Sequence, residues 1–323
     1  MRVMKICVFG AGAVGGHIAA KLAAAGNEVS VVARGAHLEA IRRNGLRLIH
    51  GEKTIQGRVR ASSDSRDLGR QDAVLVTLKA NALDAFAERA EPLLGKDTPI
   101  VFVQNGIPWW YEGAPADLDP HGSLKKAFHE DRIAGGVAYS ANDLIEPGVI
   151  ENHVPGDNMV VVGRPDKTSP PAIVRLREAL AKADISSPPV EDIRQSIWSK
   201  LAQNLGTSTL CTLTGLTVGE VRMAPGLKPL FVQAGEEARA VAAALGVDVA
   251  RAPKRPGGGH ASGAVAHKPS MLQDYERNRP MEVASQLTAP LAFARAAKVD
   301  TPLLDVIVPL VAAKAAAKGL FTH

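Results

Sequence analysis

Three polar residues in the second half of the chain are spaced four residues apart: Lys200, Asn204 and Ser208. On a helix, positions i, i+4 and i+8 share one face, so these three side chains point the same way. One cation beside an amide and a hydroxyl suits an anionic or carbonyl substrate. A polar stripe on a surface helix has the same spacing, and the spacing alone leaves both interpretations open.

A glycine-rich segment near the start of the chain has a second chemically informative spacing. It reads Gly10-Ala11-Gly12-Ala13-Val14-Gly15, directly after a short apolar run and directly before an alanine-rich segment. In a strand–turn–helix context the first glycine permits a tight turn. The second lets the backbone approach a pyrophosphate, and the third lets the helix pack on the strand. The segment predicts a dinucleotide site, against the alternative of a glycine-rich turn without a ligand.

The residue that follows the second predicted strand indicates which dinucleotide is preferred. An acidic residue there holds the ribose 2′-hydroxyl of NAD, whereas an arginine accommodates the 2′-phosphate of NADP. This chain has Arg34 at that place, after Val32 and Ala33. We therefore expect NADP(H), with an ordinary surface arginine as the alternative.

Two more polar residues follow predicted strands. Lys79 comes after the apolar run 73–78, and Asn105 comes after the run 99–103. Ligands of open α/β sheets bind outside the carboxyl ends of the strands, so both residues are candidates for the same site.

The elements that must position these residues divide the chain in two. The first half predicts a βαβ unit over 5–34, a helix over 36–44, a hairpin of 46–49 with 54–59, a helix over 83–94, and strands at 73–78, 99–103, 133–141, 148–152 and 159–163. After the proline-rich segment 186–189 the pattern is helical, with predicted helices at 193–205, 227–245, 281–298 and 303–318.

This order predicts an α/β protein: an N-terminal Rossmann-type dinucleotide-binding domain followed by an all-helical C-terminal domain. We place the NADP-binding domain at residues 1–190 and the helical substrate and dimerisation domain at 191–323, with a homodimer left open. The length of 323 residues agrees with two domains.

Composition excludes several other classes. The chain is 46% hydrophobic and 22% charged with a net charge of +5, and its basic residues are scattered, so we expect no nucleic-acid partner. The two cysteines and the pair His260 and His267 do not form a metal-site spacing, so no metal is expected. A strand beginning near Met1 leaves no room for a signal peptide, and no apolar stretch is long enough for a membrane span, which predicts a cytoplasmic protein.

Several segments together resemble the ketopantoate reductase family, the 2-dehydropantoate 2-reductases, over almost the whole chain. They are residues 5–34, TLKA around Lys79, QNG at 104–106, WSKLAQN around Lys200, and SMLQD at 270–274 followed by Glu282. Many dehydrogenases share the first segment, whereas the later ones in this order are specific to the family.

The resemblance implies NADPH-dependent reduction of a small anionic α-keto acid to an α-hydroxy acid, as in pantothenate biosynthesis. By resemblance Lys200 is the general acid, and Glu282 contacts the cofactor and sets the geometry around the lysine. Asn204 and Ser208 would hydrogen-bond the substrate, and Ser270 would help to bind its carboxylate. Lys79, Asn105 and the backbone of Ala141 resemble positions at the cofactor, with Asn105 also near the substrate.

Some segments depart from the family pattern and leave the identity of the keto acid open. Ser208 stands where the family often has Asn, and 283–288 replaces an acidic residue and an Asn-Gly pair. The run Trp109-Trp110-Tyr111 and the glycine-rich insert around His260, which we expect to be a mobile loop, are also atypical. The aromatic run could line the substrate cleft or pack against a neighbouring domain or subunit.

Two alternatives remain from the sequence. A β-hydroxyacid dehydrogenase of the hydroxyisobutyrate type also has a catalytic lysine followed four residues later by Asn, although SMLQD and Glu282 argue against it. A non-catalytic NADPH-sensing protein would keep the fold without the chemistry, and retention of both Lys200 and Glu282 argues against that.

Overall fold

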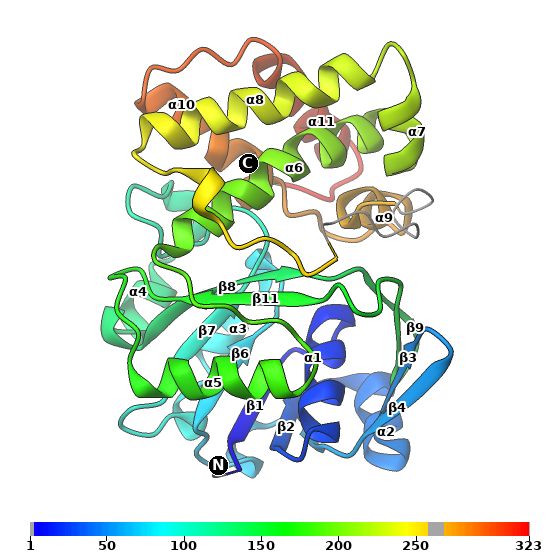
Figure 1. The fold of residues 1–323 in the computed structure, drawn as a ribbon, viewed down its shortest axis with the longest axis vertical. Helices are drawn as coiled ribbons and strands as arrows, with labels where there is room; N and C mark the ends of the chain where they lie inside the picture. Colours follow the sequence, from blue (N-terminus) through cyan, green and yellow to red (C-terminus); the bar gives the residue numbers. More distant parts are fainter. Residues whose placement is uncertain (1–2, 258–267, 323) are drawn as a thin grey trace. The chain divides into compact units, whose positions relative to one another are not determined.

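A computed structural model describes residues 3–257 and 268–322, which form two compact units (Figure 1). The first unit comprises 3–104, 121–193 and 253–257, and the second comprises 105–120, 194–252 and 268–322. His260 and His267, and with them the insert expected to be a mobile loop, lie outside the described residues.

The first unit is built on a twisted, mainly parallel sheet with the strand order β11-β8-β7-β6-β1-β2-β5. Only β11 runs antiparallel, against β8. The strands are β1 (Lys5–Phe9), β2 (Glu28–Val32), β5 (Arg60–Ser62), β6 (Ala73–Val76), β7 (Ile100–Val103), β8 (Ile133–Tyr139) and β11 (Met159–Gly163). Since the chain crosses from one strand to a parallel neighbour, the carboxyl ends of β1, β2, β6 and β7 share one edge.

A second, smaller sheet has the order β4-β3-β10-β9. Its strands are β3 (Leu46–His50), β4 (Lys53–Gly57), β9 (Asn142–Glu146) and β10 (Val149–Asn152). The hairpin of β3 and β4 confirms the sequence prediction. The strand predicted at 148–152 forms as β10, and it pairs in parallel with β3, about a hundred residues earlier, rather than with a strand of the main sheet.

Helix α1 (Ala13–Ala24) packs against strands of both sheets. Two glycines permit the close approach of the smaller sheet: a Cβ on Gly16 would lie 2.6 Å from Ile150, and one on Gly57 would lie 2.7 Å from the Ala20 backbone. With both faces covered, α1 buries two polar side chains, His17 and Lys21, along with its alanines. Lys21 Nζ reaches Asp184, where it donates to the carboxylate at 2.6 Å.

The other helices of this unit are α2 (Gly35–Asn44), α3 (Asp84–Ala87), α4 (Ser123–Ala127) and α5 (Pro171–Lys182), of which α4 and α5 escaped sequence prediction. The predicted helix over 83–94 was wrong, since only α3 and a 3-10 turn at Glu91–Leu93 form there. Pro92 supplies no backbone N–H, and the Leu93 carbonyl accepts a hydrogen bond from Gln71 N rather than continuing a helix.

The second unit is helical in its described part. Its helices are α6 (Ile193–Thr214), α7 (Val218–Met223), α8 (Lys228–Ala244), α9 (Ser270–Glu276), α10 (Ala289–Ala296) and α11 (Leu304–Ala316), with a π-helical turn at Ala284–Thr288 before α10. Helix α6 extends beyond the predicted end at Leu205. Helix α6 packs closely on α8 at a glycine: a Cβ on Gly206 would lie only 2.9 Å from the Phe231 carbonyl oxygen.

The aromatic run after β7 packs inside the second unit. Tyr111 is 6% exposed, and its hydroxyl accepts a hydrogen bond from Trp198 Nε1 at 2.8 Å. Both rings meet Phe293 edge-on. Tyr111 therefore fastens the loop to α6 and α10, which favours packing as the role of this tyrosine.

We predict that His17 makes the protein less stable as the pH falls. Burial, and then the positive charges of Lys21 and His50, lower the pKa of His17 from 6.5 to about 3. Because the unfolded chain takes up a proton below pH 6.5 that the folded chain does not, the free energy of unfolding falls by up to ~1.4 kcal/mol per pH unit. Between pH 7 and pH 5 this residue alone costs about 2 kcal/mol.

The measurement is urea unfolding of the wild type and of His17→Leu at both pH values. The leucine variant should lose about 2 kcal/mol less than the wild type over this interval, whatever its stability at pH 7. Equal losses for the two proteins would show that His17 is protonated in the folded state.

Candidate active site

The glycine-rich segment forms the turn between β1 and α1 and gives its three glycines separate roles. Gly10 has φ = +106°, which disfavours residues with a Cβ. A Cβ on Gly15 would overlap the Gly10 carbonyl oxygen and Thr77 Oγ1, so this glycine sets how closely α1 approaches the sheet. A Cβ on Gly12 would have no neighbour within 4 Å. Gly12 is thus open, and an approaching ligand can reach its backbone.

Two residues that the sequence analysis missed hold the carbonyl groups of this turn. Thr77 Oγ1 donates to the Gly10 oxygen at 2.5 Å. His37 accepts from Gly148 N on Nδ1 at 2.9 Å, so its proton lies on Nε2, which donates to the Ala11 oxygen at 2.6 Å. With these carbonyls engaged, the first N–H groups of α1 remain for an anion at the helix N-terminus. A threonine after a strand and a histidine in a helix gave no signal, because their partners are distant in sequence.

Arg34 follows β2 and is exposed at the N-cap position of α2. The amide of Gly10 donates to the Val32 oxygen at 3.1 Å, which joins the glycine turn to the end of β2. A guanidinium next to a helix N-terminus is a favourable place for a phosphate, because both bring positive charge.

Lys79 and Ala141 complete the candidates in the first unit. Lys79 is half-buried, two residues after Thr77, the residue that holds the Gly10 carbonyl. The Ala141 oxygen accepts from His153 N at 2.9 Å and from Asn152 Nδ2 at 3.3 Å. The carbonyl of Ala141 is thereby engaged within the sheet, and its N–H is the backbone group left for a ligand.

In the second unit, Lys200, Asn204 and Ser208 all lie within α6, so the helical spacing is real. Lys200 and Asn204 are half-buried, and Ser208 is buried. The residues expected on the other faces, Trp198, Leu201 and Leu205, are at most 1% exposed. Helix α6 thus combines a packed apolar side with a polar face that holds a single cation.

Ser270 and Glu282 lie on neighbouring segments of the same unit. Ser270 is the first residue of α9 and is exposed, and Glu282 lies half-buried just before the helical segment that includes the π turn. The residues that flank them, Met271, Met281 and Val283, share one apolar core with Ala202 and Leu205 of α6. This shared core fixes the three segments to one another. A carboxylate near the start of a helix is also stabilised by the helix dipole.

The loop that carries Asn105 is docked on the π turn. Ile107 N donates to the Ser285 oxygen at 2.8 Å, and a Cβ on Gly106, which has φ = +86°, would overlap the same carbonyl group. The Ser285 carbonyl is used outside the helix, which is a physical reason for the wider turn at this point. Asn105 is consequently held next to the segment that begins with Glu282.

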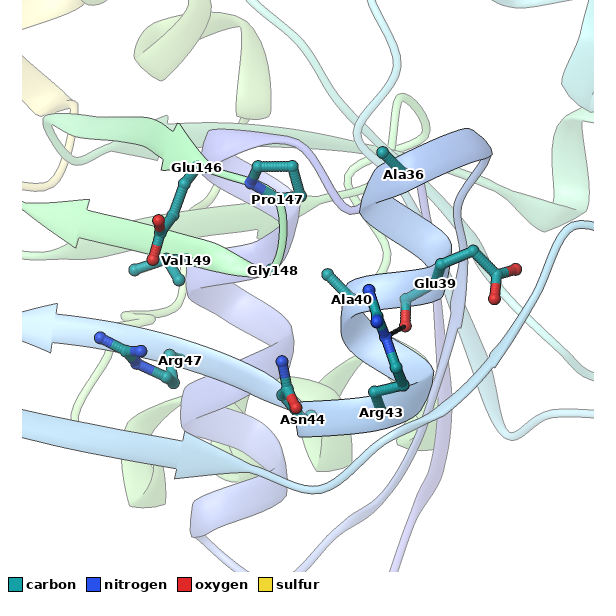
Figure 2. Close-up of a pocket in the computed structure, with 11 residues that line it drawn as sticks. Ala36, Glu39, Ala40, Arg43, Asn44, Arg47, Glu146, Pro147, Gly148 and Val149 are labelled. Carbon is teal, nitrogen blue, oxygen red and sulfur yellow. Dashed lines mark hydrogen bonds between the residues drawn. The ribbon is translucent and has the colours of Figure 1, made fainter.

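A pocket of about 330 Å³ lies elsewhere in the first unit, between α2, β3 and the turn from β9 to β10 (Figure 2). Arg43 and Arg47 face it together with Glu39 and Glu146, so its charges balance. None of the predicted site residues lines it. Gly148, which lines the pocket, is nonetheless linked to the glycine turn through His37, whose ring hydrogen-bonds to Gly148 N and to the Ala11 oxygen.

The described residues also bear on metal binding and on membrane insertion. No group of three or more histidine, cysteine, aspartate or glutamate side chains that could hold a metal ion occurs among them. None of their helices is long and apolar enough to cross a membrane.

A glycine turn of this geometry on a mainly parallel sheet, followed by a helical unit that presents a lysine, is typical of dinucleotide-dependent oxidoreductases. Residues 6–167 match the family described as Ketopantoate reductase PanE/ApbA, and residues 192–315 match Ketopantoate reductase PanE/ApbA C terminal. The chain belongs to the ketopantoate reductase family, as its sequence motifs indicated.

Individual relatives agree over nearly the full length. The 2-dehydropantoate 2-reductase of Mesorhizobium japonicum is 39% identical over 329 aligned residues, covering 99% of this chain and all of the relative. A crystal structure described as a ketopantoate reductase from Ralstonia solanacearum MolK2 has a TM-score of 0.85 at 30% identity, over 99% of this chain and all of the other. D-mandelate dehydrogenase, solved with NADH and anilino(oxo)acetate, shares the fold at 22% identity with a TM-score of 0.81, over 98% of this chain and all of the other.

The contrast between Gly12 and Gly15 yields a paired prediction. Gly15→Ala should lower the free energy of unfolding by roughly 1–3 kcal/mol, because the new methyl group overlaps fixed backbone. Gly12→Ala should change it by less than about 1 kcal/mol, yet weaken dinucleotide binding, because the methyl group occupies space that the ligand needs.

Urea unfolding and NADPH titration by fluorescence measure the two effects. If Gly12→Ala binds NADPH as tightly as the wild type does, the open space at Gly12 is not where the pyrophosphate lies.

Proposed function

We propose that the protein is an NADPH-dependent α-keto acid reductase that converts 2-dehydropantoate or a related keto acid to the α-hydroxy acid. The observation that supports this most directly is the single cation, Lys200, on an α6 face otherwise made of amide and hydroxyl groups. The names of the relatives support the substrate class.

The residues of the first unit suit the cofactor. When bound, NADPH supplies the hydride. The N–H groups at the start of α1 would hold its pyrophosphate, and Arg34 with the N-terminus of α2 would hold the 2′-phosphate. Lys79 and the Ala141 N–H would contact the same cofactor. The preference for NADPH over NADH rests on Arg34.

The residues of the second unit suit the keto acid. Lys200 would stabilise negative charge on the ketone oxygen as hydride reaches the carbon, and then donate a proton to that oxygen. Asn105, Asn204 and Ser208 would hydrogen-bond the substrate, and the Ser270 hydroxyl would bind its carboxylate. Glu282 would set the geometry around Lys200 and contact the cofactor.

A panel of α-keto acids with NADPH, followed at the nicotinamide absorbance, tests the proposal. Reduction of 2-dehydropantoate or a close analogue supports it. A parallel assay of 3-hydroxy acids with NADP⁺ tests the first alternative, since activity confined to them would favour a β-hydroxyacid dehydrogenase. Binding of NADPH without any turnover would favour a sensor.

The remaining assignments follow from the sequence and stay predictions. We assign residues 1–190 to the cofactor and 191–323 to the substrate and to dimerisation. A cytoplasmic location agrees with a role in pantothenate biosynthesis, and a homodimer is a question for sedimentation.

Substitution of Arg34 tests the cofactor assignment. Arg34→Ala should weaken NADPH binding by one to two decades and leave NADH nearly unaffected, because a charge-assisted contact is worth roughly 1.5–3 kcal/mol. Titration of both cofactors into both proteins gives the answer, with Arg43→Ala, a change on the same helix, as the control. A wild type that prefers NADH would refute the role given to Arg34.

Substitution of Lys200 tests the proton donor. Lys200→Ala should lower kcat by roughly 10²–10⁴-fold, the usual contribution of a positioned general acid, while NADPH affinity changes little. Steady-state kinetics and NADPH titration separate the two quantities. Near-normal turnover in this variant would remove the lysine from the mechanism.

A further inference from the structure

Gln286 occupies an unusual position in the π turn before α10. It is 2% exposed, and its Nε2 donates to Glu282 Oε2 at 3.3 Å. Its other end, Oε1, is buried without a hydrogen-bond partner among the described residues. Because a carboxylate can only accept, the contact with Glu282 fixes which end of the amide is the donor and leaves the carbonyl oxygen as an open acceptor.

A buried acceptor without a partner is uncommon in a folded protein and calls for an explanation. The adjacent Ser285 Oγ, 1% exposed, also has no partner within the described chain. Two polar groups on consecutive residues are thus buried without partners among the described residues, about one turn from a carboxylate assigned to the active site. This pattern points to a polar ligand rather than to apolar packing.

The docking of the Asn105 loop explains how the turn holds Gln286 there. The Ser285 carbonyl binds Ile107 N, and Gly106 leaves no room between the loop and the turn. The backbone N–H of Gln286 donates to the backbone carbonyl oxygen of Glu282 at 3.2 Å. The backbone and the side chain of Gln286 therefore both contact Glu282. The residue cannot move without disturbing the carboxylate.

We propose that Gln286 determines substrate specificity: its Oε1 accepts a hydrogen bond from a hydroxyl group on the side chain of the keto acid, while its N–H group positions Glu282. This rests on the proposed function and deepens it. It also gives a role to the segment 283–288, in which the chain departs from the family pattern. An enzyme with this residue should favour keto acids that have such a hydroxyl over those of equal shape that lack it.

The test compares 2-dehydropantoate with its analogue in which the terminal hydroxyl is replaced by a methyl group. The measured quantity is the ratio of the two kcat/KM values. Gln286→Met keeps the length but removes both polar atoms, and should reduce the ratio about tenfold or more. Gln286→Glu keeps an acceptor oxygen but donates to Glu282 only while one of the two adjacent carboxyls is protonated, so it should keep the ratio and make kcat for both substrates fall as the pH rises.

A matched control exists in the same unit. Gln233 donates to Glu237 at 2.9 Å with the same i, i+4 spacing, on α8. Gln233→Met should leave the ratio and kcat unchanged, and urea unfolding reports whether each variant is folded. Gln286→Asn, which withdraws the oxygen by one methylene group, replaces the methionine variant if that one does not fold, and should also reduce the ratio.

The outcomes separate the claims. If the ratio of the two kcat/KM values in Gln286→Met, or in Gln286→Asn, equals that of the wild type, the specificity role is overturned. A pH profile of kcat in Gln286→Glu equal to that of the wild type overturns the positioning role. If the wild type reduces neither substrate nor any other keto acid, the proposed function itself fails and this inference fails with it.

Discussion

The approach of α1 to the sheet at Gly15 is the contact on which the first unit depends. No side chain fits there, because the Gly10 oxygen and Thr77 Oγ1 occupy the space that a Cβ would take. The same closeness places the helix N-terminus beside the turn and brings Thr77 and His37 to the carbonyls of Gly10 and Ala11. On its other side α1 supports the smaller sheet through Gly16 and Gly57. The position of the α1 N-terminus and the burial of the helix thus follow from one steric constraint.

The second unit depends on helix α6, which has one apolar face and one polar face. Buried residues such as Trp198 and Leu205 fix the rotation of α6, and this rotation orients Lys200 and Asn204. The Trp198 N–H is satisfied by Tyr111, so the aromatic run contributes to the orientation of the polar face. In the proposed mechanism this packing fixes where the Lys200 ammonium group lies, and its position is what suits it to stabilise the ketone oxygen and protonate it.

The local sequence pattern predicted most of the features that are determined by residues close together in the sequence. The βαβ unit, the hairpin and the face of Lys200 follow from periodicity and from glycine positions, and the motifs indicated the family. The features that the sequence did not predict depend on contacts between residues distant in sequence. Pairing of β10 with β3 joins segments about a hundred residues apart, and the π turn forms because Ser285 is engaged by Ile107 from another loop. His17 is buried because two sheets cover α1, which no pattern within 13–24 discloses.

The central claim is that this chain delivers a hydride from NADPH to the carbon of an α-keto acid. The most direct measurement follows deuterium from NADPH labelled at the transferring position of the nicotinamide, with the product examined by NMR. We predict deuterium on the α-carbon of the hydroxy acid, one atom for each NADPH oxidised. An α-carbon with hydrogen from solvent, or oxidation of NADPH without a labelled hydroxy acid, would contradict the account.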